Sequence, residues 1–128
     1  MIIGIGTDLV DVRRIRESLE RHGDRFANKI LSKNETIEFQ QCGERIKPHF
    51  LAKRFAAKEA TVKALGTGFR DGIQLRDIEV THTDKGKPEL KLSGAAKREQ
   101  QHLGVISTHI SISDEHEHAV AFVIMEKE

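Results

Sequence analysis

The sequence predicts a single α+β domain over residues 1–128, in which helices pack on an antiparallel sheet. Apolar side chains recur at helical spacing along residues 51–65, whereas residues 108–113 alternate and residues 119–125 are almost wholly apolar, as in strands. Residues 78–92 have the composition of a β-hairpin. No repeat, low-complexity segment or linker divides the chain, so these elements are expected to share one core.

The charge balance and the cysteine count narrow the function classes. The chain has 21 Lys and Arg against 20 Asp and Glu, a net charge of +1, which does not indicate a nucleic-acid binder. It has no leader-like segment and no apolar run of membrane length. Its single cysteine, Cys42, cannot form an internal disulfide and suits a reducing compartment. We therefore expect a cytoplasmic protein with no nucleic-acid or membrane partner.

The chain begins with a short β-branched segment that is typical of a buried strand. Residues 1–5 form this segment. Gly4 within it and Gly6 just after it leave space for another backbone or a ligand to approach closely. Asp8 follows beyond the expected end of this strand. Its carboxylate belongs either to the N-terminal cap region of the next helix or to a site held by a rigid strand, and both interpretations remain open.

The next helix is expected over residues 11–22, where apolar positions recur at spacings of three and four and Gly23 follows. Its opposite side carries basic residues, here called the arginine stripe: Arg14, Arg21 and, if the helical turn continues, Arg25. Such a stripe is commonly a solvated surface. In a nearly neutral protein it is alternatively a docking surface for an acidic partner, because opposite charge speeds encounter and fixes orientation.

Shorter elements are expected on both sides of the central helix. Residues 26–31 indicate a helical turn, and Ser32 with Glu35 fits a capping box that opens a short helix through Phe39. Residues 43–48 form a polar connection into the central helix. After that helix we expect a loop over residues 67–77, a hairpin over residues 78–92 and a helix capped by Ser93 over residues 95–103. Two antiparallel strands are expected to follow, over residues 108–113 and 119–125.

The central helix combines an apolar face with misplaced charges. It ends at Gly66, because glycine readily adopts the left-handed conformation of a helix C-cap. Lys58 projects into the middle of the apolar side, and Glu59 and Lys63 lie four residues apart at its border. Lys58 could extend its ammonium group to water, and Glu59 and Lys63 could be an ordinary surface ion pair. Charges that break an apolar pattern also mark functional sites.

Asp8, Glu59 and Lys63 together indicate phosphoryl chemistry. Two carboxylates without a convincing histidine pair or a second cysteine favour a hard cation such as Mg²⁺ over zinc. Lysines beside such a cation, near the glycine turn at residues 66–68, suit a ligand that carries phosphates. The two histidines in residues 116–118 have the i, i+2 spacing of a strand or turn, and are interpreted as a solvated hairpin tip.

Four motifs spread over nearly the whole chain resemble one family. They are IGIGTDLVDV with RRI soon after it, FLAKRFAAKEATVKALGTG in the middle, the GKP turn, and the terminal HISISDEHEHAVAFVI. The chain thereby resembles the holo-acyl-carrier-protein synthases, the short phosphopantetheinyl transferases of bacterial fatty-acid synthesis. The resemblance implies transfer of the 4′-phosphopantetheine arm of coenzyme A to a serine of apo-acyl carrier protein, with release of adenosine 3′,5′-bisphosphate.

The resemblance also implies roles for particular residues. Asp8 and Glu59 would bind Mg²⁺, and Lys63 would neutralise or protonate the leaving phosphate. The remaining residues expected to contact coenzyme A are Lys58, in the same positive pocket, Gly66, Thr67 and Gly68 by their backbone, and His109 and Ser111 beside the 3′-phosphate of adenosine. The arginine stripe would dock the acidic carrier protein.

Members of this family are homotrimers with coenzyme A between subunits, which would allow Lys58 to point into an interfacial site rather than into the core. Two other functions are compatible with the charged residues. A Mg²⁺-dependent nuclease also uses Asp, Glu and Lys, but its usual Glu-x-Lys strand spacing is absent, because Glu59 and Lys63 are four residues apart. A non-catalytic trimeric binding module would use the charges for assembly.

Overall fold

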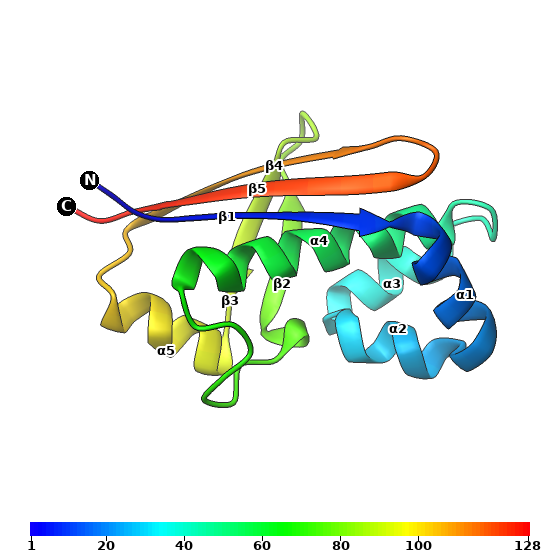
Figure 1. The fold of residues 1–128 in the computed structure, drawn as a ribbon, viewed down its shortest axis with the longest axis horizontal. Coiled ribbons are helices and arrows are strands. Elements are labelled where there is room, and N and C mark those ends of the chain that lie inside the picture. Colours follow the sequence, from blue (N-terminus) through cyan, green and yellow to red (C-terminus); the bar gives the residue numbers. More distant parts are fainter.

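The computed structural model describes residues 1–128 and confirms the α+β fold, with two antiparallel sheets and five helices (Figure 1). The larger sheet has the order β1-β5-β4 and the smaller one pairs β2 with β3. The strands are β1 (Ile2–Asp11), β2 (Ile78–His82), β3 (Pro88–Leu92), β4 (Ser107–Asp114) and β5 (His118–Glu126). The helices are α1 (Val12–His22), α2 (Asp24–Ile30), α3 (Lys33–Gln41), α4 (Lys47–Leu65) and α5 (Gly94–His102), with a 3₁₀ turn at Leu75–Asp77.

Helix α4 lies along one face of the β1-β5-β4 sheet, and the other helices gather at its two ends (Figure 1). α1, α2 and α3 lie near the start of α4, and α5 lies near its end. The alternation of β5 places Ala119, Ala121, Val123 and Met125 in the core against α4. None of the five helices combines the length and the apolar composition of a membrane-spanning segment.

Strand β1 is twice as long as its first five residues predict, and this corrects the interpretation of Asp8. The strand continues through Asp11 because it pairs with β5 along its length, with Asp8 opposite Ala121. Asp8 therefore lies within the strand and does not cap a helix. The N-cap of α1 is Asp11, whose Oδ1 accepts a hydrogen bond from the backbone N–H of Arg13 at 2.9 Å.

Two glycines let β1 lie directly against α4, as the sequence predicts for a close backbone approach. A Cβ atom added at Gly4 would lie 2.0 Å from the carbonyl oxygen of Ala64. A Cβ atom at Gly6 would lie 1.9 Å from the carbonyl oxygen of Ala60. Any side chain at either position would push the strand off the helix, because these distances are far below van der Waals contact.

The predicted helix ends are confirmed in part. α4 ends at Gly66 with a left-handed backbone (φ 79°), and the capping box of Ser32 and Glu35 opens α3, so both predictions are confirmed. Ser93 does not cap α5 with its side chain, because its hydroxyl donates to the carbonyl oxygen of Asp77 at 3.3 Å. The helical turn of α1 does not continue past Gly23, so Arg25 belongs to the separate helix α2.

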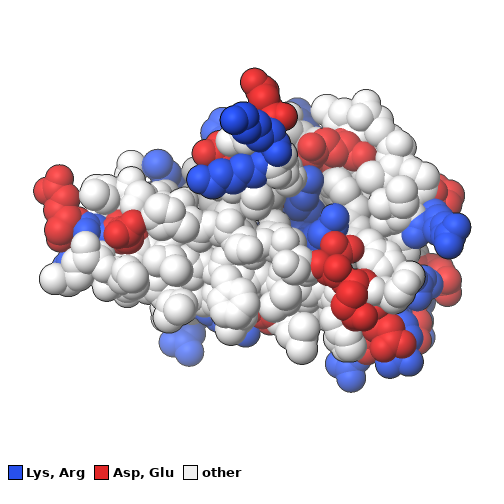
Figure 2. Space-filling view, turned by 90° about the horizontal axis from the view of Figure 1, so that it is seen from above, with Lys and Arg blue, Asp and Glu red and all other residues white.

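The sheet face that points away from α4 is apolar and exposed. Its apolar residues, here called the outer apolar face, are Ile5, Leu9, Val120, Phe122 and Ile124. The exposed fractions of Ile5, Leu9 and Phe122 are 66%, 67% and 51%. Figure 2 looks onto this face and shows a broad surface along the sheet with few charged side chains, which gather at its margins. An apolar surface of this extent typically marks an interaction site.

Candidate active site

The contact between β1 and α4 brings together three residues that the sequence singles out. Asp8 projects from the helix-facing side of β1, and Glu59 and Lys63 are one turn apart on α4. The ammonium group of Lys63 donates to Asp8 Oδ1 at 3.2 Å and to the carbonyl oxygen of Thr7 at 2.9 Å. Lys63 therefore pairs with Asp8 rather than with Glu59, so the surface ion pair considered above does not form.

The electrostatics around Glu59 favour a bound cation. Partial burial raises the pKa of Glu59 above its ordinary value, the negative charge of Asp8 raises it further, and Lys63 offsets only part of this. Two carboxylates that repel each other gain stability when a cation binds between them.

The donor set fits Mg²⁺ better than a fully protein-coordinated metal. No group of three or more His, Cys, Asp or Glu side chains is arranged to hold a metal ion. Mg²⁺ does not need such a group, because it usually keeps several waters and binds one or two carboxylates together with substrate phosphates. Asp8 and Glu59 supply the two carboxylates, so the residues present fit this ion.

A groove begins beside Lys63 and follows the end of α4. Its volume is about 610 Å³, within the range of small-molecule sites. The lining residues are Ile2, Ile3, Gly4, Ile5, Lys63, Ala64, Leu65, Gly66, Leu103 and Lys127. Lys63 and Lys127 are its charged groups, so it suits an anionic ligand with apolar parts. Gly66 lines this groove, and the hydroxyl of Thr67 donates to the carbonyl oxygen of Gly68 at 2.8 Å. The contact of these three residues with coenzyme A stays a prediction.

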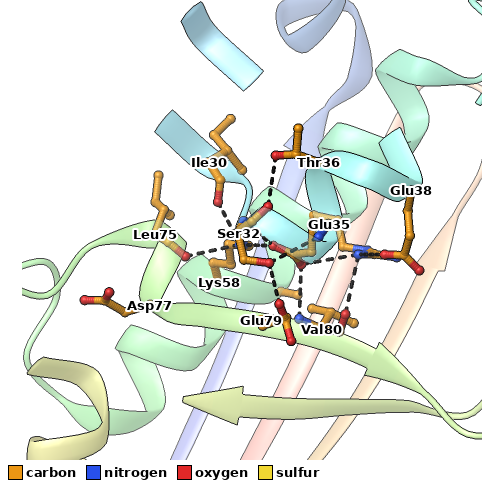
Figure 3. Close-up of polar contacts among 12 residues, drawn as sticks. Ile30, Ser32, Glu35, Thr36, Glu38, Lys58, Leu75, Asp77, Glu79 and Val80 are labelled. Carbon is orange, nitrogen blue, oxygen red and sulfur yellow. Dashed lines mark hydrogen bonds and ion pairs between the residues drawn. The ribbon is translucent and has the colours of Figure 1, made fainter. Parts of the chain in front are cut away.

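Lys58 does not belong to this pocket, which corrects the role expected for it. Its side chain is completely buried and points toward Glu35 of α3 and Leu75 of the 3₁₀ turn (Figure 3). The ammonium group donates to Glu35 Oε1 at 2.5 Å and to the carbonyl oxygens of Ile30 and Leu75 at 2.7 and 3.1 Å. All three of its donors are used within one chain, so Lys58 points neither to water nor into an interfacial site.

His109 and Ser111 lie on the outer face of the sheet, with β5 between them and β1. His109 Nε2 is 2.6 Å from Glu126 Oε1, and this contact helps to hold the pKa of Glu126 below its ordinary value. Asp8 projects from the opposite face. One chain therefore does not bring His109 and Ser111 to the Asp8–Glu59 pair, and their contact with coenzyme A stays a prediction that requires a second subunit.

The arginine stripe is exposed and has no ion-pair partner in the chain. Arg14, Arg21 and Arg25 are all exposed, and none is within 4.0 Å of a carboxylate oxygen. Arg14 and Arg21 lie on α1, and Arg25 lies on the adjacent α2. These guanidinium groups without an internal counterion leave this end of the molecule able to attract an acidic surface.

Sequence reasoning missed the second role of Glu35. The capping-box pattern identified Glu35 as part of the start of a helix. Its carboxylate is also fully buried and forms ion pairs with Lys58 and Arg54. The only signal in the sequence was the lysine on the apolar face of α4, which required a buried partner somewhere in the chain.

Comparisons of the sequence and of the structure with known proteins agree on one family, and the matches cover nearly the whole chain. The family model described as the 4′-phosphopantetheinyl transferase superfamily matches residues 4–123. A protein of Halorhodospira halophila named holo-[acyl-carrier-protein] synthase is 54% identical, with 98% of each chain covered. The crystal structure of the synthase from Neisseria meningitidis superposes with a TM-score of 0.92 at 42% identity, covering 99% of this chain and 100% of that one.

A second solved structure contains a ligand. The holo-(acyl-carrier-protein) synthase from Bacillus anthracis, in complex with CoA (3′,5′-ADP), has a TM-score of 0.84 and 39% identity. The match covers 100% of this chain and 99% of that one.

Proposed function

This chain belongs to the 4′-phosphopantetheinyl transferase superfamily, and we propose that it moves the 4′-phosphopantetheine group of coenzyme A onto a serine of apo-acyl carrier protein. The observation that carries this proposal is the meeting of Asp8, Glu59 and Lys63 at the β1–α4 contact. A carrier-protein synthase at 54% identity and a neighbouring structure with bound coenzyme A support it.

Asp8 and Glu59 are the residues that would hold Mg²⁺, which when bound neutralises charge on the diphosphate and on the phosphoryl oxygens of the transition state. In the transfer, the serine oxygen bonds to the phosphorus next to pantetheine as the bond from that phosphorus to the bridging oxygen breaks. The proton of the serine is released to solvent water, and adenosine 3′,5′-bisphosphate leaves with the bonding electrons. The proposed role of Lys63, whose side chain is 52% exposed, is to neutralise or protonate this leaving group.

The groove beside Lys63 is the proposed place for part of coenzyme A, because its two lysines and its apolar wall match an anionic ligand with an apolar arm. A role in bacterial fatty acid biosynthesis follows from the carrier substrate that the family resemblance implies. A cytoplasmic location is proposed with it, and the unpaired thiol of Cys42 is consistent with a reducing compartment.

The proposed reaction is tested by incubating the protein with coenzyme A, Mg²⁺ and an apo-acyl carrier protein and then measuring the mass of the carrier. A synthase adds the mass of one phosphopantetheine group. A Mg²⁺-dependent nuclease instead cleaves nucleic acid in the same buffer, and a binding module leaves the carrier unchanged. An unmodified carrier would contradict the proposal.

We also propose a homotrimer assembled through the outer apolar face. The support is the exposure of Ile5, Leu9 and Phe122 on one face of the sheet, together with the family resemblance. His109 and Ser111 lie on the same side of the sheet, so an assembly built on this face would bring them near a neighbouring subunit.

Phe122→Glu is expected to convert the trimer to monomers, because it places a charge in the middle of the proposed interface. Sedimentation equilibrium measures the change. Ile37→Glu is the matched control, since Ile37 is equally exposed, at 54%, but lies on α3 away from this face, and it should leave the trimer intact. A wild-type monomer at micromolar concentration with full activity would exclude the proposed assembly.

We propose that the arginine stripe docks the carrier protein. Reversing the charges of Arg14 and Arg21 is expected to raise KM for the carrier while KM for coenzyme A changes little. The wild-type KM for the carrier should also rise with salt, because attraction between exposed charges is screened over about 8–10 Å.

Steady-state kinetics with each substrate varied in turn distinguish these effects. Reversal of Lys97 and Arg98, which are exposed on α5, is the matched control and should leave the carrier KM unchanged. If reversal at Arg14 and Arg21 has no larger effect than this control, the stripe is only a solvated surface.

A further inference from the structure

A buried ion cluster lies under α4, on a side of the helix that the proposed reaction does not use. Its centre is Glu35, which is completely buried (Figure 3). Glu35 Oε1 accepts from Lys58 Nζ at 2.5 Å and from the backbone N–H of Ser32 at 2.9 Å. Its Oε2 accepts from the backbone N–H of Val80 at 3.0 Å and from Arg54 at 3.3 Å.

The cluster joins α4 to α2, α3, β2 and the 3₁₀ turn. Lys58 also donates to the last residue of α2 and to the 3₁₀ turn, and Arg54 also contacts Glu38 of α3 and the carbonyl oxygen of Val80 in β2. No buried side-chain nitrogen or oxygen in the structure lacks a hydrogen-bond partner. Each of these bonds is directional, so together they define one position of α4.

The charge state of Glu35 agrees with this arrangement. Burial alone would raise the pKa of its carboxyl, but the charge and hydrogen bond of Lys58 and the N–H groups of Ser32 and Val80 outweigh burial and hold the pKa below its ordinary value. Glu35 is therefore ionised beneath α4.

Stability is a weak explanation for such a cluster. Removing charges from water is costly, and replacing a buried ion pair by apolar side chains of similar volume is often neutral or stabilising. The sheet side of α4 offers fewer directional contacts, because there the glycines of β1 lie against the backbone of Ala60 and Ala64, apolar side chains of β5 pack on the helix, and Lys63 supplies the hydrogen bonds to β1. Apolar packing has no preferred direction, whereas the hydrogen bonds on the far side of α4 do, so the cluster adds a directional constraint on the rotation of the helix.

Glu59 follows Lys58 directly in the chain, so the rotation that Lys58 fixes also sets the direction of the Glu59 carboxylate. Catalytic groups must be held within about 0.5 Å of their productive geometry by residues that are themselves locked. We infer that Glu35 is a positioning residue: through Lys58 and Arg54 it fixes the rotation of α4 so that Glu59 and Lys63 face Asp8. This inference rests on the proposed function.

The test removes both charges of the central pair, so that no unpaired charge is left in the core. In Glu35→Leu/Lys58→Met, apolar side chains replace the ion pair. The melting temperature is expected to fall, because the N–H groups of Ser32 and Val80 and the carbonyl oxygen of Ile30 lose their partners, so kcat is measured at a temperature at which the variant is folded. The value of kcat is expected to fall by about 10- to 100-fold, because misplacement by about 1 Å costs up to 10²-fold. The Mg²⁺ concentration for half-maximal rate should rise, while KM for the carrier stays unchanged.

A second measurement does not depend on activity. Titration with Mg²⁺ alone, followed by the shift in melting temperature, should show weaker binding in the double variant than in the wild type. Thr61→Val is the matched control, because Thr61 is buried on α4 and its hydroxyl bonds only to Ala57 of the same helix. It should leave kcat and Mg²⁺ binding at wild-type values.

A folded double variant with wild-type kcat and Mg²⁺ binding would overturn the inference and leave the cluster a purely structural role. If the Leu/Met pair does not fold, Glu35→Gln/Lys58→Met is measured by the same criteria, since the glutamine oxygen still accepts from the N–H group of either Ser32 or Val80. Failure of the proposed function is distinguishable, because the wild-type protein would then be inactive in the carrier assay.

Discussion

Glu59→Gln is expected to lower kcat by about 10²–10³, comparable to the loss of a single electrostatic element that stabilises a transition state. Glutamine keeps the shape of the side chain but removes the negative charge that a hard cation requires. Asp8 then remains as the only carboxylate at the β1–α4 contact, and it is already paired with Lys63. The measurement is kcat as a function of Mg²⁺ concentration for the wild type and the variant.

Folding stability should move in the opposite direction to activity. The pKa of Glu59 is raised by burial and by Asp8, so the folded state holds this proton more tightly than the unfolded state does. Its contribution to stability is complete below the ordinary pKa and is lost as the pH rises through the raised value. At neutral pH the ionised carboxylate is therefore unfavourable, and Glu59→Gln should melt at the wild-type temperature or slightly above it.

Melting curves with and without Mg²⁺ complete the test. Mg²⁺ should raise the melting temperature of the wild type but not of Glu59→Gln, because a ligand that binds only the folded state stabilises it. Glu89→Gln, at an exposed position of β3, is the matched control and should retain the wild-type response. A well-folded Glu59→Gln enzyme with near-normal rate and Mg²⁺ dependence would show that Glu59 is not a metal ligand.

Gly6→Ala is expected to reduce the free energy of unfolding by about 3 kcal/mol, at the upper end of the usual cost of overpacking. The added Cβ would meet the carbonyl oxygen of Ala60 at 1.9 Å and the backbone nitrogen of Ala64 at 2.8 Å. These are backbone atoms of a buried helix, so they cannot rotate away as a side chain can. The strand must move off α4 and will carry Asp8 with it.

Urea denaturation measures this loss, and the carrier assay should show a fall in kcat at temperatures where the variant is still folded. Gly43→Ala is the matched control, because nothing lies within 4 Å of a Cβ at Gly43 and its backbone φ is not in the left-handed region. Equal stability of the two variants would show that β1 and α4 do not need this close contact.

The sequence by itself determined most element types and several of their ends. Helical spacing, the glycine after Leu65 and the pairing of Ser32 with Glu35 depend on neighbours within a few residues, and the structure confirms all three. Strand alternation likewise placed His109 and Ser111 on one side of β4. The motifs spread over the chain identified the family, which the family model and the relatives confirm.

Only the tertiary structure decided features that depend on partners far apart in the chain. β1 extends to Asp11 because it pairs with His118 of β5, so Asp8 is a strand residue. Lys58 can be buried because its ammonium group bonds to the carboxylate of Glu35, which lies 23 residues away in the chain. Local periodicity records which side chains share a face, but not which distant residue meets that face. The partners of Asp8 and Lys58 were therefore fixed only when β1, α3 and α4 packed together.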